Sequence, residues 1–365
     1  MTSFDERALA LRPPVGRALV GALGPIAAGF ALAALLQFVV GPAVGPFYAK
    51  VMTDAGIAVV LAVSLNLVNG YTGQFSIGHA GFMAVGGYTA GAITFYSHQL
   101  LWGSVAQQGG FFGATTTIYV MALITGGCTA ALCGVLVGLP SLRLRGDYLA
   151  IVTLGFGEIL RVLLQRSGDV IFDPEAIAEA DPFTLATSLG GALGFTGIPF
   201  ITNLFWVWLA VAIVLLVSYR LKRSDQGRAL LSIREDEVAA EAMGIPTTRF
   251  KVQAFVYAAF FAGIAGGLFA HEVGTTLNPN ELGFQKSFEI VIMVVLGGMG
   301  SVSGTTLAAI ALTVLPEALR EFSEYRMIAY ALLLIIVMLW RPQGLMGVRE
   351  VWELPLLRRW FGGQR

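Results

Sequence analysis

Residues 204–219 read LFWVWLAVAIVLLVSY, an apolar run without a charged side chain. About 20 consecutive apolar residues allow an α-helix to cross the hydrocarbon core of a bilayer. The run is continuous rather than alternating, which is typical of a spanning helix and not of a strand in a membrane barrel. This stretch therefore predicts a transmembrane helix and places the chain among integral membrane proteins.

Similar runs occur on both sides of this one. Of the 365 residues, 56% are hydrophobic and only 13% are charged, fewer than in a soluble domain. Further stretches reach the length of a span, or approach it and need flanking residues: Leu19–Val40, Ala55–Val68, Phe82–Tyr96, Thr117–Leu139, Tyr148–Leu164, Val252–Ala270, Phe288–Leu296, Leu307–Leu319 and Met327–Trp340. We predict an all-α integral membrane protein, a polytopic bundle of about ten transmembrane helices in a single domain over residues 1–365.

The distribution of Lys and Arg predicts the orientation, because cytoplasmic segments carry an excess of these residues. If ten spans leave both termini in the cytoplasm, the cytoplasmic segments hold 17 of the 23 Lys and Arg residues. The most basic of them is the loop of residues 220–250, and the loop of residues 166–200 falls outside. We expect a multi-pass protein of the cytoplasmic (inner) membrane with both termini in the cytoplasm. No basic stripe suggests a nucleic-acid partner.

The basic loop contains a locally specified helix within REDEVAAEAMGI, residues 234–245. Ser232 and Glu235 form a capping box, and the acidic residues that follow fill the first turn, where the helix dipole favours negative charge. Gly244 offers a left-handed stop. These signals predict a helix from Ile233 to Met243. Because this helix is acidic, a protein partner fits it better than a membrane surface does.

Two Gly-rich stretches interrupt the apolar pattern, NGYTGQFSIGHAGF at residues 69–82 and LGGMGSVSGTT at residues 296–306. In transporters, broken helices expose backbone groups to substrate, but small residues also allow tight turns and close packing. Both interpretations stay open for the first stretch, and a tight turn is favoured for the second. The second lacks the Gly-Lys-Ser/Thr ending of a phosphate loop, so it predicts no nucleotide site. Polar candidates for a pathway lie in and before the first stretch: Asn66, Asn69, Gln74 and Ser76.

Glu158 is the strongest ionisable candidate inside a span, with Arg161 three residues later on the same helix face. The pair can hold the bundle together, which is favoured, or line a pathway. Glu289 follows Lys286 at the same spacing and is interpreted in the same way. No nucleophile–base arrangement is visible. The histidines are too scattered along the chain to predict a metal site: His79, His98 and His271.

Several segments resemble one family. GRALLSIREDEVAAEAMGI (residues 227–245) resembles the cytoplasmic coupling loop of ABC importer permeases, in the form found in branched-chain amino acid permeases. The same family is matched by SLNLVNGYTGQFSIGHAGFMAVGGYTA (64–90), LPSLRLRGDYLAIVTLGFGEILR (139–161), VVLGGMGSVSGTTLAA (294–309), LPEALREFSEYR (315–326) and WRPQGL (340–345). The resemblance covers residues 50–345, and its order and length are specific for the LivM-type subunit.

This resemblance implies the permease subunit of an ATP-binding cassette importer for branched-chain, hydrophobic amino acids. The chain itself would be non-catalytic and without a cofactor. Its implied partners are a second, LivH-like permease, two cytoplasmic ATPase subunits and an extracytoplasmic substrate-binding protein. ATPase coupling would fall to Arg234, Glu235, Asp236, Glu237, Ala239, Ala240 and Gly244. A urea or short-amide permease of the same family, or an ion-coupled secondary transporter, remains an alternative.

The sequence departs from the family pattern in two places. Val238 occupies the acidic position of the importer loop, and Glu237 stands one residue early. The outer loop carries an acidic insert instead of the expected Gly-Gly-Pro-Asn-Gly stretch. Without any Lys or Arg in between, the insert predicts either a solvated, partly disordered loop or a docking surface for the binding protein. Its acidic residues are Asp169, Asp173, Glu175, Glu179 and Asp181.

Overall fold

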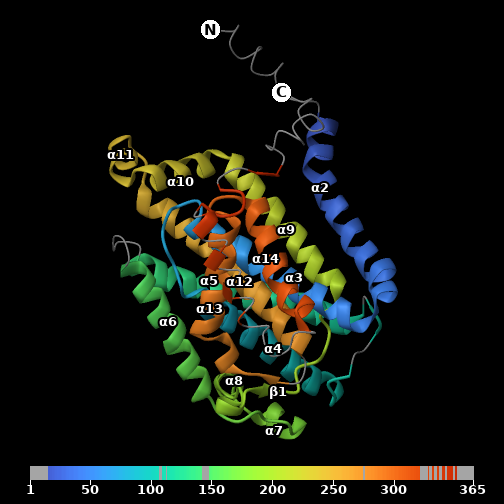
Figure 1. Ribbon diagram of the computed structural model, residues 1–365. Helices are drawn as coiled ribbons and strands as arrows, with labels where there is room; N and C mark the ends of the chain where they lie inside the picture. The colour runs from blue at the N-terminus through green and yellow to red at the C-terminus, as the bar shows by residue number, and fades with distance from the viewer. Residues whose placement is uncertain are drawn as a thin grey trace.

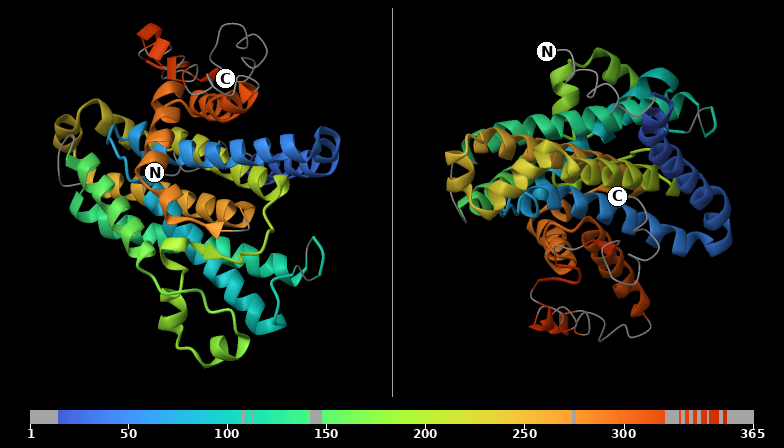
Figure 2. Two further views of the ribbon diagram at one scale, coloured as in Figure 1. Left: turned by 60° about the horizontal axis from the view of Figure 1, so that its bottom comes forward. Right: turned by 90° about the horizontal axis from the view of Figure 1, so that it is seen from above.

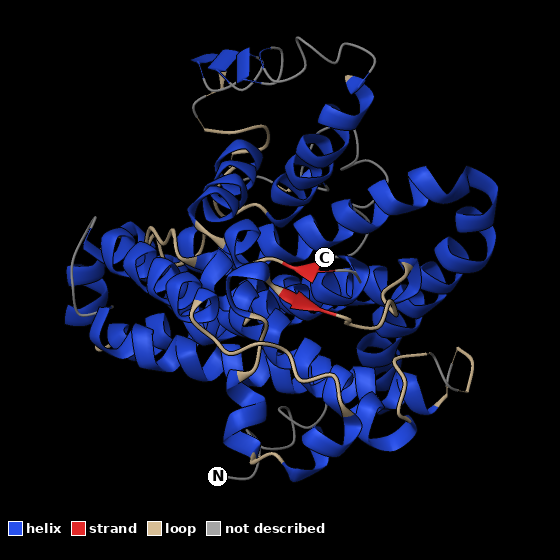
Figure 3. Ribbon diagram, turned by 90° about the horizontal axis from the view of Figure 1, so that it is seen from below, coloured by secondary structure: helices blue, strands red, loops and turns tan. Residues whose placement is uncertain are grey.

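The computed structural model describes residues 15–106, 109–111, 113–141, 148–273 and 276–320, with shorter pieces between residues 328 and 351. In these ranges the only strands are β1 (Phe195–Thr196) and β2 (Thr276–Leu277), which pair antiparallel (Figure 3). Everything else that is regular is helical, so the all-α prediction is confirmed. Five described segments are long and apolar enough to span a membrane: Leu23–Asn69, Ala114–Ser141, Tyr148–Gln165, Leu204–Arg223 and Thr247–Val273.

All but one of the predicted spans coincide with described helices (Figure 1). These are α2 (Val15–Leu35), α3 (Gly41–Asn69), α4 (His79–Trp102), α5 (Ala114–Ser141), α6 (Tyr148–Gln165), α9 (Leu204–Arg223), α12 (Thr247–Val273), α13 (Phe284–Gly297) and α14 (Val302–Ala318). The exception, Met327–Trp340, lies largely outside the described residues. The largest boundary difference is in α3. A π-helix at Leu36–Val40 joins it to α2, and Gly45, with a φ of 82°, redirects the chain.

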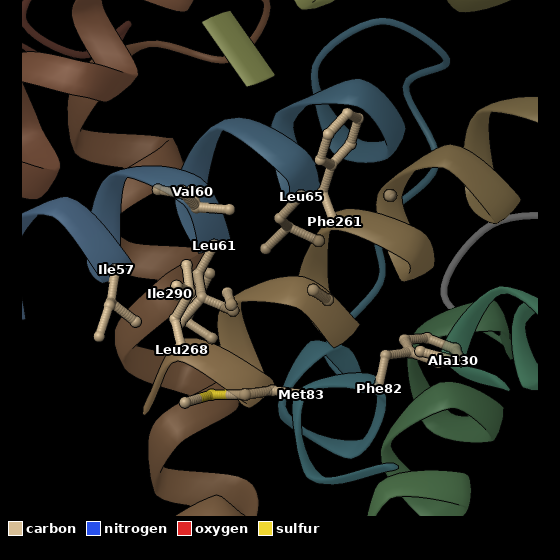
Figure 4. Close-up of a cluster of buried hydrophobic side chains, with 14 of the residues drawn as sticks. Ile57, Val60, Leu61, Leu65, Phe82, Met83, Ala130, Phe261, Leu268 and Ile290 are labelled. Atoms are coloured by element: carbon tan, nitrogen blue, oxygen red, sulfur yellow. The ribbon is translucent and has the colours of Figure 1, made fainter. Parts of the chain in front are cut away.

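The centre of the bundle is α12, which packs against α3, α4 and α5. Glycine sets the spacing between α4 and α12. A Cβ atom on Gly86 would lie 2.2 Å from the backbone of Gly263, and one on Gly266 would lie 1.9 Å from the carbonyl oxygen of Met83. The two backbones therefore touch directly, as small residues permit in membrane helices. Apolar side chains of α3, α4 and α12 fill the remaining space (Figure 4).

The two unusual loops lie at opposite ends of the bundle (Figure 1). One end carries α10 (Asp225–Glu235) and α11 (Glu237–Ala242). The other carries α7 (Pro174–Glu179) and α8 (Pro182–Thr187), next to 3-10 turns at Gly191–Leu193 and Pro279–Leu282. Between the two ends, α13 and α14 lie side by side against α3 (Figure 2).

Neither Gly-rich stretch breaks a helix. The first connects the end of α3 to the start of α4, and the second connects α13 to α14. The second is a tight turn, as favoured, in which Gly298 and Gly300 have φ angles of 103° and 92°. The tight turn is thus confirmed for the second stretch, whereas the first is a longer non-helical connection over residues 70–78.

Candidate coupling site

The basic loop folds as two short helices, not as the single helix predicted from Ile233 to Met243. Helix α10 begins after Ser224, whose side chain caps its first turn, and continues to Glu235. Ser232 lies inside α10, and its hydroxyl donates to the carbonyl oxygen of Ala229 at 2.8 Å. The predicted capping box at Ser232 is therefore wrong.

Asp236 ends α10 and caps α11. Its backbone is extended, with φ −156° and ψ 109°, and its carboxylate accepts hydrogen bonds from the N–H groups of Val238 and Ala239 at 2.9 and 3.0 Å. Such a cap stabilises a short helix by about 1 kcal/mol. The predicted stop at Gly244 is confirmed, because its φ is 84° and its N–H donates to the carbonyl oxygen of Glu241.

Arg234 connects this loop to both Gly-rich stretches. Its Nη1 donates to the carbonyl oxygen of Gly70 at 2.8 Å and to that of Met299 at 3.3 Å. Gly70 follows α3, and Met299 lies between α13 and α14, so one guanidinium group joins three parts of the bundle. Lys222, in the last turn of α9, donates to the neighbouring carbonyl oxygen of Gly300 at 2.7 Å.

Asn66 of α3 also holds the turn between α13 and α14 in place. Its Oδ1 accepts from the N–H of Gly300 at 2.8 Å, and its Nδ2 donates to the carbonyl oxygen of Ser301 at 3.2 Å. The side chain is buried, so both polar atoms require these partners. In this structure Asn66 joins α3 to the turn between α13 and α14.

Asn69 has a comparable role one turn later. Its Oδ1 accepts from the N–H of Ser76 at 3.1 Å, and its Nδ2 donates to the carbonyl oxygen of Ser76 at 3.3 Å. Both residues are buried, and Gln74 between them is half-buried. These pathway candidates thus lie close together, and the two buried ones fold the connection between α3 and α4 onto itself.

Glu158 lies apart from them, on α6. Its Oε2 accepts from Nε of Arg161 at 2.8 Å, which is the pairing indicated by their spacing. Its Oε1 accepts from the N–H of Phe284 at 3.0 Å. The pair therefore connects α6 to the start of α13.

The tip of the loop exposes apolar side chains. Val238 is 64% exposed and Met243 is 83% exposed. Around them lie exposed acidic residues: Glu235, Asp236 and Glu241. Sequence reasoning did not single out Met243 as a contact. An amphipathic pattern within only six helical residues is too short to show which face points outward.

Two predicted coupling residues face inward instead. Ala240 is only 5% exposed, so its small side chain packs within its own chain. The carboxylate of Glu237 pairs with Nζ of Lys251 on α12 at 2.5 Å, and the Lys251 side chain is 2% exposed. Glu237 therefore holds α11 against α12. Sequence reasoning missed this role of Lys251. Lys251 counted only among the charges that predict the orientation of the chain.

Glu350 occupies the N-terminus of α14. Its carboxylate accepts from the N–H groups of Val302 and Ser303 at 3.1 and 3.0 Å and from Nζ of Lys222 at 2.5 Å. Burial raises the pKa of Glu350, but the hydrogen bonds from Lys222, Ser303 and Val302 outweigh it and hold the pKa below its usual value. A carboxylate at this helix terminus disfavours phosphate there, which agrees with the missing phosphate-loop lysine.

The acidic insert at the other end is folded, so the partly disordered alternative is wrong. Ile177 of α7 is buried, and the Tyr96 hydroxyl of α4 donates to the carbonyl oxygen of Ser188 at 2.6 Å. The five carboxylates of the insert remain exposed. Close to them, Phe183 and Leu193 are 78% and 82% exposed.

Two of the scattered histidines share one partner. Nε2 of His271 lies 2.7 Å from Oγ1 of Thr94, and Nδ1 of His98 lies 2.7 Å from the carbonyl oxygen of Thr94. Sequence separation therefore concealed their proximity. Within the described part of the chain, no group of three or more His, Cys, Asp or Glu residues is arranged to hold a metal ion.

Comparison with known proteins identifies the family. Residues 47–339 match the family described as branched-chain amino acid transport system / permease component. A high-affinity branched-chain amino acid transport system permease protein, LivM of Salmonella typhimurium, is 37% identical over 312 residues, which are 81% of this chain and 69% of that protein. LivM of Escherichia coli is 38% identical over 306 residues, 80% of this chain and 68% of that protein.

A shorter match links the chain to a second type of permease. LivH of Escherichia coli, also a high-affinity branched-chain amino acid transport system permease protein, is 32% identical over 149 residues, 40% of this chain and 47% of that protein. No solved structure matches the chain. The family match over residues 47–339 and the two LivM relatives show that the chain is a multi-pass membrane protein, a non-catalytic transport subunit that belongs to the permease family of branched-chain amino acid transport systems.

Proposed function

We propose that this chain is a permease subunit of an importer that uses ATP hydrolysis to carry branched-chain amino acids across the cytoplasmic membrane. The family supports the transport of these substrates. The geometry of α10 and α11 supports the coupling to an ATPase. This loop presents an apolar, acid-flanked tip, while Arg234 holds its base against the connections of α3, α13 and α14.

The coupling residues divide into two groups with different tasks. Glu235, Asp236, Ala239 and Gly244 are exposed and would contact the ATPase beside Val238 and Met243. Arg234, Glu237 and Ala240 would transmit its movement, because they are bonded to or packed on the bundle. Nucleotide would bias the bundle between inward-open and outward-open states by shifting this loop. This division rests on the exposure of each side chain and on the ion pair between Glu237 and Lys251.

The proposed assembly contains two cytoplasmic ATPase subunits, a second permease and an extracytoplasmic binding protein. The partial match to LivH supports a second permease of related sequence. The α10–α11 end would face the cytoplasm and the α7–α8 end the outside. The excess of Lys and Arg in residues 220–251 supports this orientation. The exposed acidic and apolar side chains of the insert suit the binding protein.

The test is reconstitution of all subunits in sealed vesicles. Leucine should accumulate only with ATP and with every partner present. Urea or acetamide accumulation in place of leucine would favour the short-amide alternative. Leucine uptake by this chain alone under a sodium or proton gradient would contradict the proposal and favour a secondary transporter.

A further inference from the structure

A cavity of about 370 Å³ opens between α3, α13 and α14, with Met83 of α4 at its inner wall. Its volume is at the lower end of the range for small-molecule sites. Of the candidates chosen from the sequence, only Lys286 and Glu289 line it, and a structural role was favoured for this pair. The cavity therefore needs an explanation of its own.

Ionisable side chains gather on one side of this cavity. Asp54, Lys286, Glu289 and Glu317 line it, and all four come from the parts of α3, α13 and α14 that are nearer to the α7–α8 end. Lys286 pairs with Glu289 at 3.2 Å, and Asp54 pairs at 3.5 Å with Lys50, which does not line the cavity. Charges inside a membrane bundle are costly and mark substrate pathways.

The opposite wall is apolar and buried. It consists of Ile57 and Leu61 of α3, Met83 of α4, and Ile290 and Met293 of α13. Each of these side chains is at most 8% exposed. Leu61, Ile290, Ile57 and Met83 belong to the buried cluster drawn in Figure 4. An apolar ligand side chain that entered here would leave water, which favours binding.

The two walls together match one chemical class. A zwitterion with a branched apolar side chain has an ammonium group for carboxylates, a carboxylate for a lysine and a hydrocarbon part for the buried wall. The cavity is also placed for transport, because its charged side faces the end that would meet the binding protein. Its apolar wall leads along α13 towards the turn at Gly298. In this turn the carbonyl oxygen of Met299 accepts a hydrogen bond from Arg234.

We infer that this cavity holds the transported amino acid at an intermediate point of its path, an inference that rests on the proposed function. Asp54, Glu289 and Glu317 receive the ammonium group, and Lys286 receives the carboxylate. Ile57, Leu61, Met83 and Ile290 contact the branched side chain. The competing occupants are a lipid acyl chain and a surface of the second permease, because either would cover the apolar wall of the cavity.

Photo-crosslinking tests the occupant in the complete reconstituted importer. A leucine analogue with a diazirine side chain should label residues of the cavity wall on α3 and α13, and excess unlabelled leucine should abolish this labelling. Labelling confined to other subunits would overturn the inference. Labelling that leucine does not compete would also overturn it, and would indicate a non-specific apolar pocket.

A cavity-filling variant tests the role in transport. Ala58→Phe places a ring at a half-buried lining position and should lower leucine uptake by about tenfold or more, because a filled cavity no longer accepts the ligand. Thr313→Phe fills the cavity from α14. The two variants are compared because one of them alone could lose uptake through misfolding. The matched control is Phe288→Trp, an exposed position on α13 that does not line the cavity.

The outcomes separate the two proposals. If the parent importer accumulates leucine and both variants assemble and transport like the control, the inference alone is wrong. If the parent complex with all its subunits does not accumulate leucine, the proposed function fails and the inference falls with it. Uptake lost in both variants but retained in the control, with ATPase subunits still bound, supports the inference.

Discussion

The two ends of the bundle differ in how their loops are attached. At the α10–α11 end, cationic side chains reach inward: Arg234 and Lys222 donate to backbone carbonyl oxygens between spanning helices. At the α7–α8 end, the acidic side chains are exposed, and the insert is attached by the buried Ile177, by the ring of Phe172 against Phe95 and by the hydrogen bond from the Tyr96 hydroxyl to Ser188. A displacement of the first loop must therefore move α3, α13 and α14. A displacement of the second can be absorbed within the insert.

The comparison depends on the two ends lying on opposite sides of the membrane. Reporter fusions after Arg223 should give a cytoplasmic signal, and fusions near Asp181 an external one. This result is all-or-none, and activity of a periplasm-dependent reporter measures it. A cytoplasmic signal at Asp181 would remove both the orientation and the proposed contact with the binding protein.

The mechanical connection can be broken at Arg234. Arg234→Ala removes charge-assisted hydrogen bonds that each contribute about 1.5–3 kcal/mol, so ATP-driven leucine uptake should fall by roughly tenfold or more. The ATPase subunits should still bind, because the exposed tip is unchanged. Uptake and ATPase co-purification are measured together. The control is Arg228→Ala, since Arg228 is exposed and pairs with Asp225 three residues earlier in the same helix. Equal uptake in the two variants would contradict the assigned role of Arg234.

The apolar tip of the loop can be altered without changing Arg234. Val238→Asp combined with Met243→Asp should release most of the ATPase subunits, because a buried apolar side chain contributes about 1.5–3 kcal/mol. Co-purification with the tagged ATPase measures this loss. Leu193→Asp is the matched control at the other end, where an equally exposed apolar side chain should have no effect on ATPase binding. Retained ATPase in the double variant would mean that the tip is not the interface.

A smaller effect is expected at the Glu237–Lys251 pair. Glu237→Gln leaves the buried ammonium group of Lys251 without its counter-charge, and should lower the free energy of unfolding by about 1–3 kcal/mol. Thermal unfolding in detergent measures the change. Adding Lys251→Met to Glu237→Gln should restore much of the stability, because the unpaired charge is gone. If Glu237→Gln is as stable as the parent, the pair does not hold α11 on α12.

The smallest effect concerns pH at Glu350. Because the folded pKa lies below the ordinary value of 4.5, the carboxylate stabilises the fold above that value, and the contribution is lost as the pH falls through the folded pKa. Glu350→Gln should therefore unfold at a lower temperature than the parent at pH 7, by an amount corresponding to about 1 kcal/mol. The two midpoints should converge in acid. A difference that persists unchanged below the folded pKa would assign it to packing instead of charge.

The sequence predicted the spanning helices well, because continuous apolar runs report burial in lipid directly. It did not predict the division of the basic loop. Ser232 and Asp236 are both good caps locally, and long-range packing decides between them, since Leu230 and Ile233 of α10 are buried against the bundle. The same reason explains Ala240: its size suggested a contact surface, and only the tertiary structure shows that it faces inward.

The candidate pathway residues stay a prediction, and the structure adds only their hydrogen-bond partners. Their polarity and their place near glycine suggested contact with substrate. In the structure, the side chains of Asn66 and Asn69 form hydrogen bonds with backbone groups of their own chain. Single-sequence patterns show which residues are polar but not which partners they meet. The cavity at Asp54 and Lys286 combines residues more than 200 positions apart, and no local pattern connects them.

The glycine contacts between α4 and α12 limit how any transport cycle can proceed. With a virtual Cβ only 1.9 Å from the facing backbone at Gly266, these helices can neither approach nor rotate past one another. A distance measured between spin labels on α4 and α12 should stay constant through the cycle, while one between α12 and α14 changes. On this expectation α4 and α12 move together as one unit during transport.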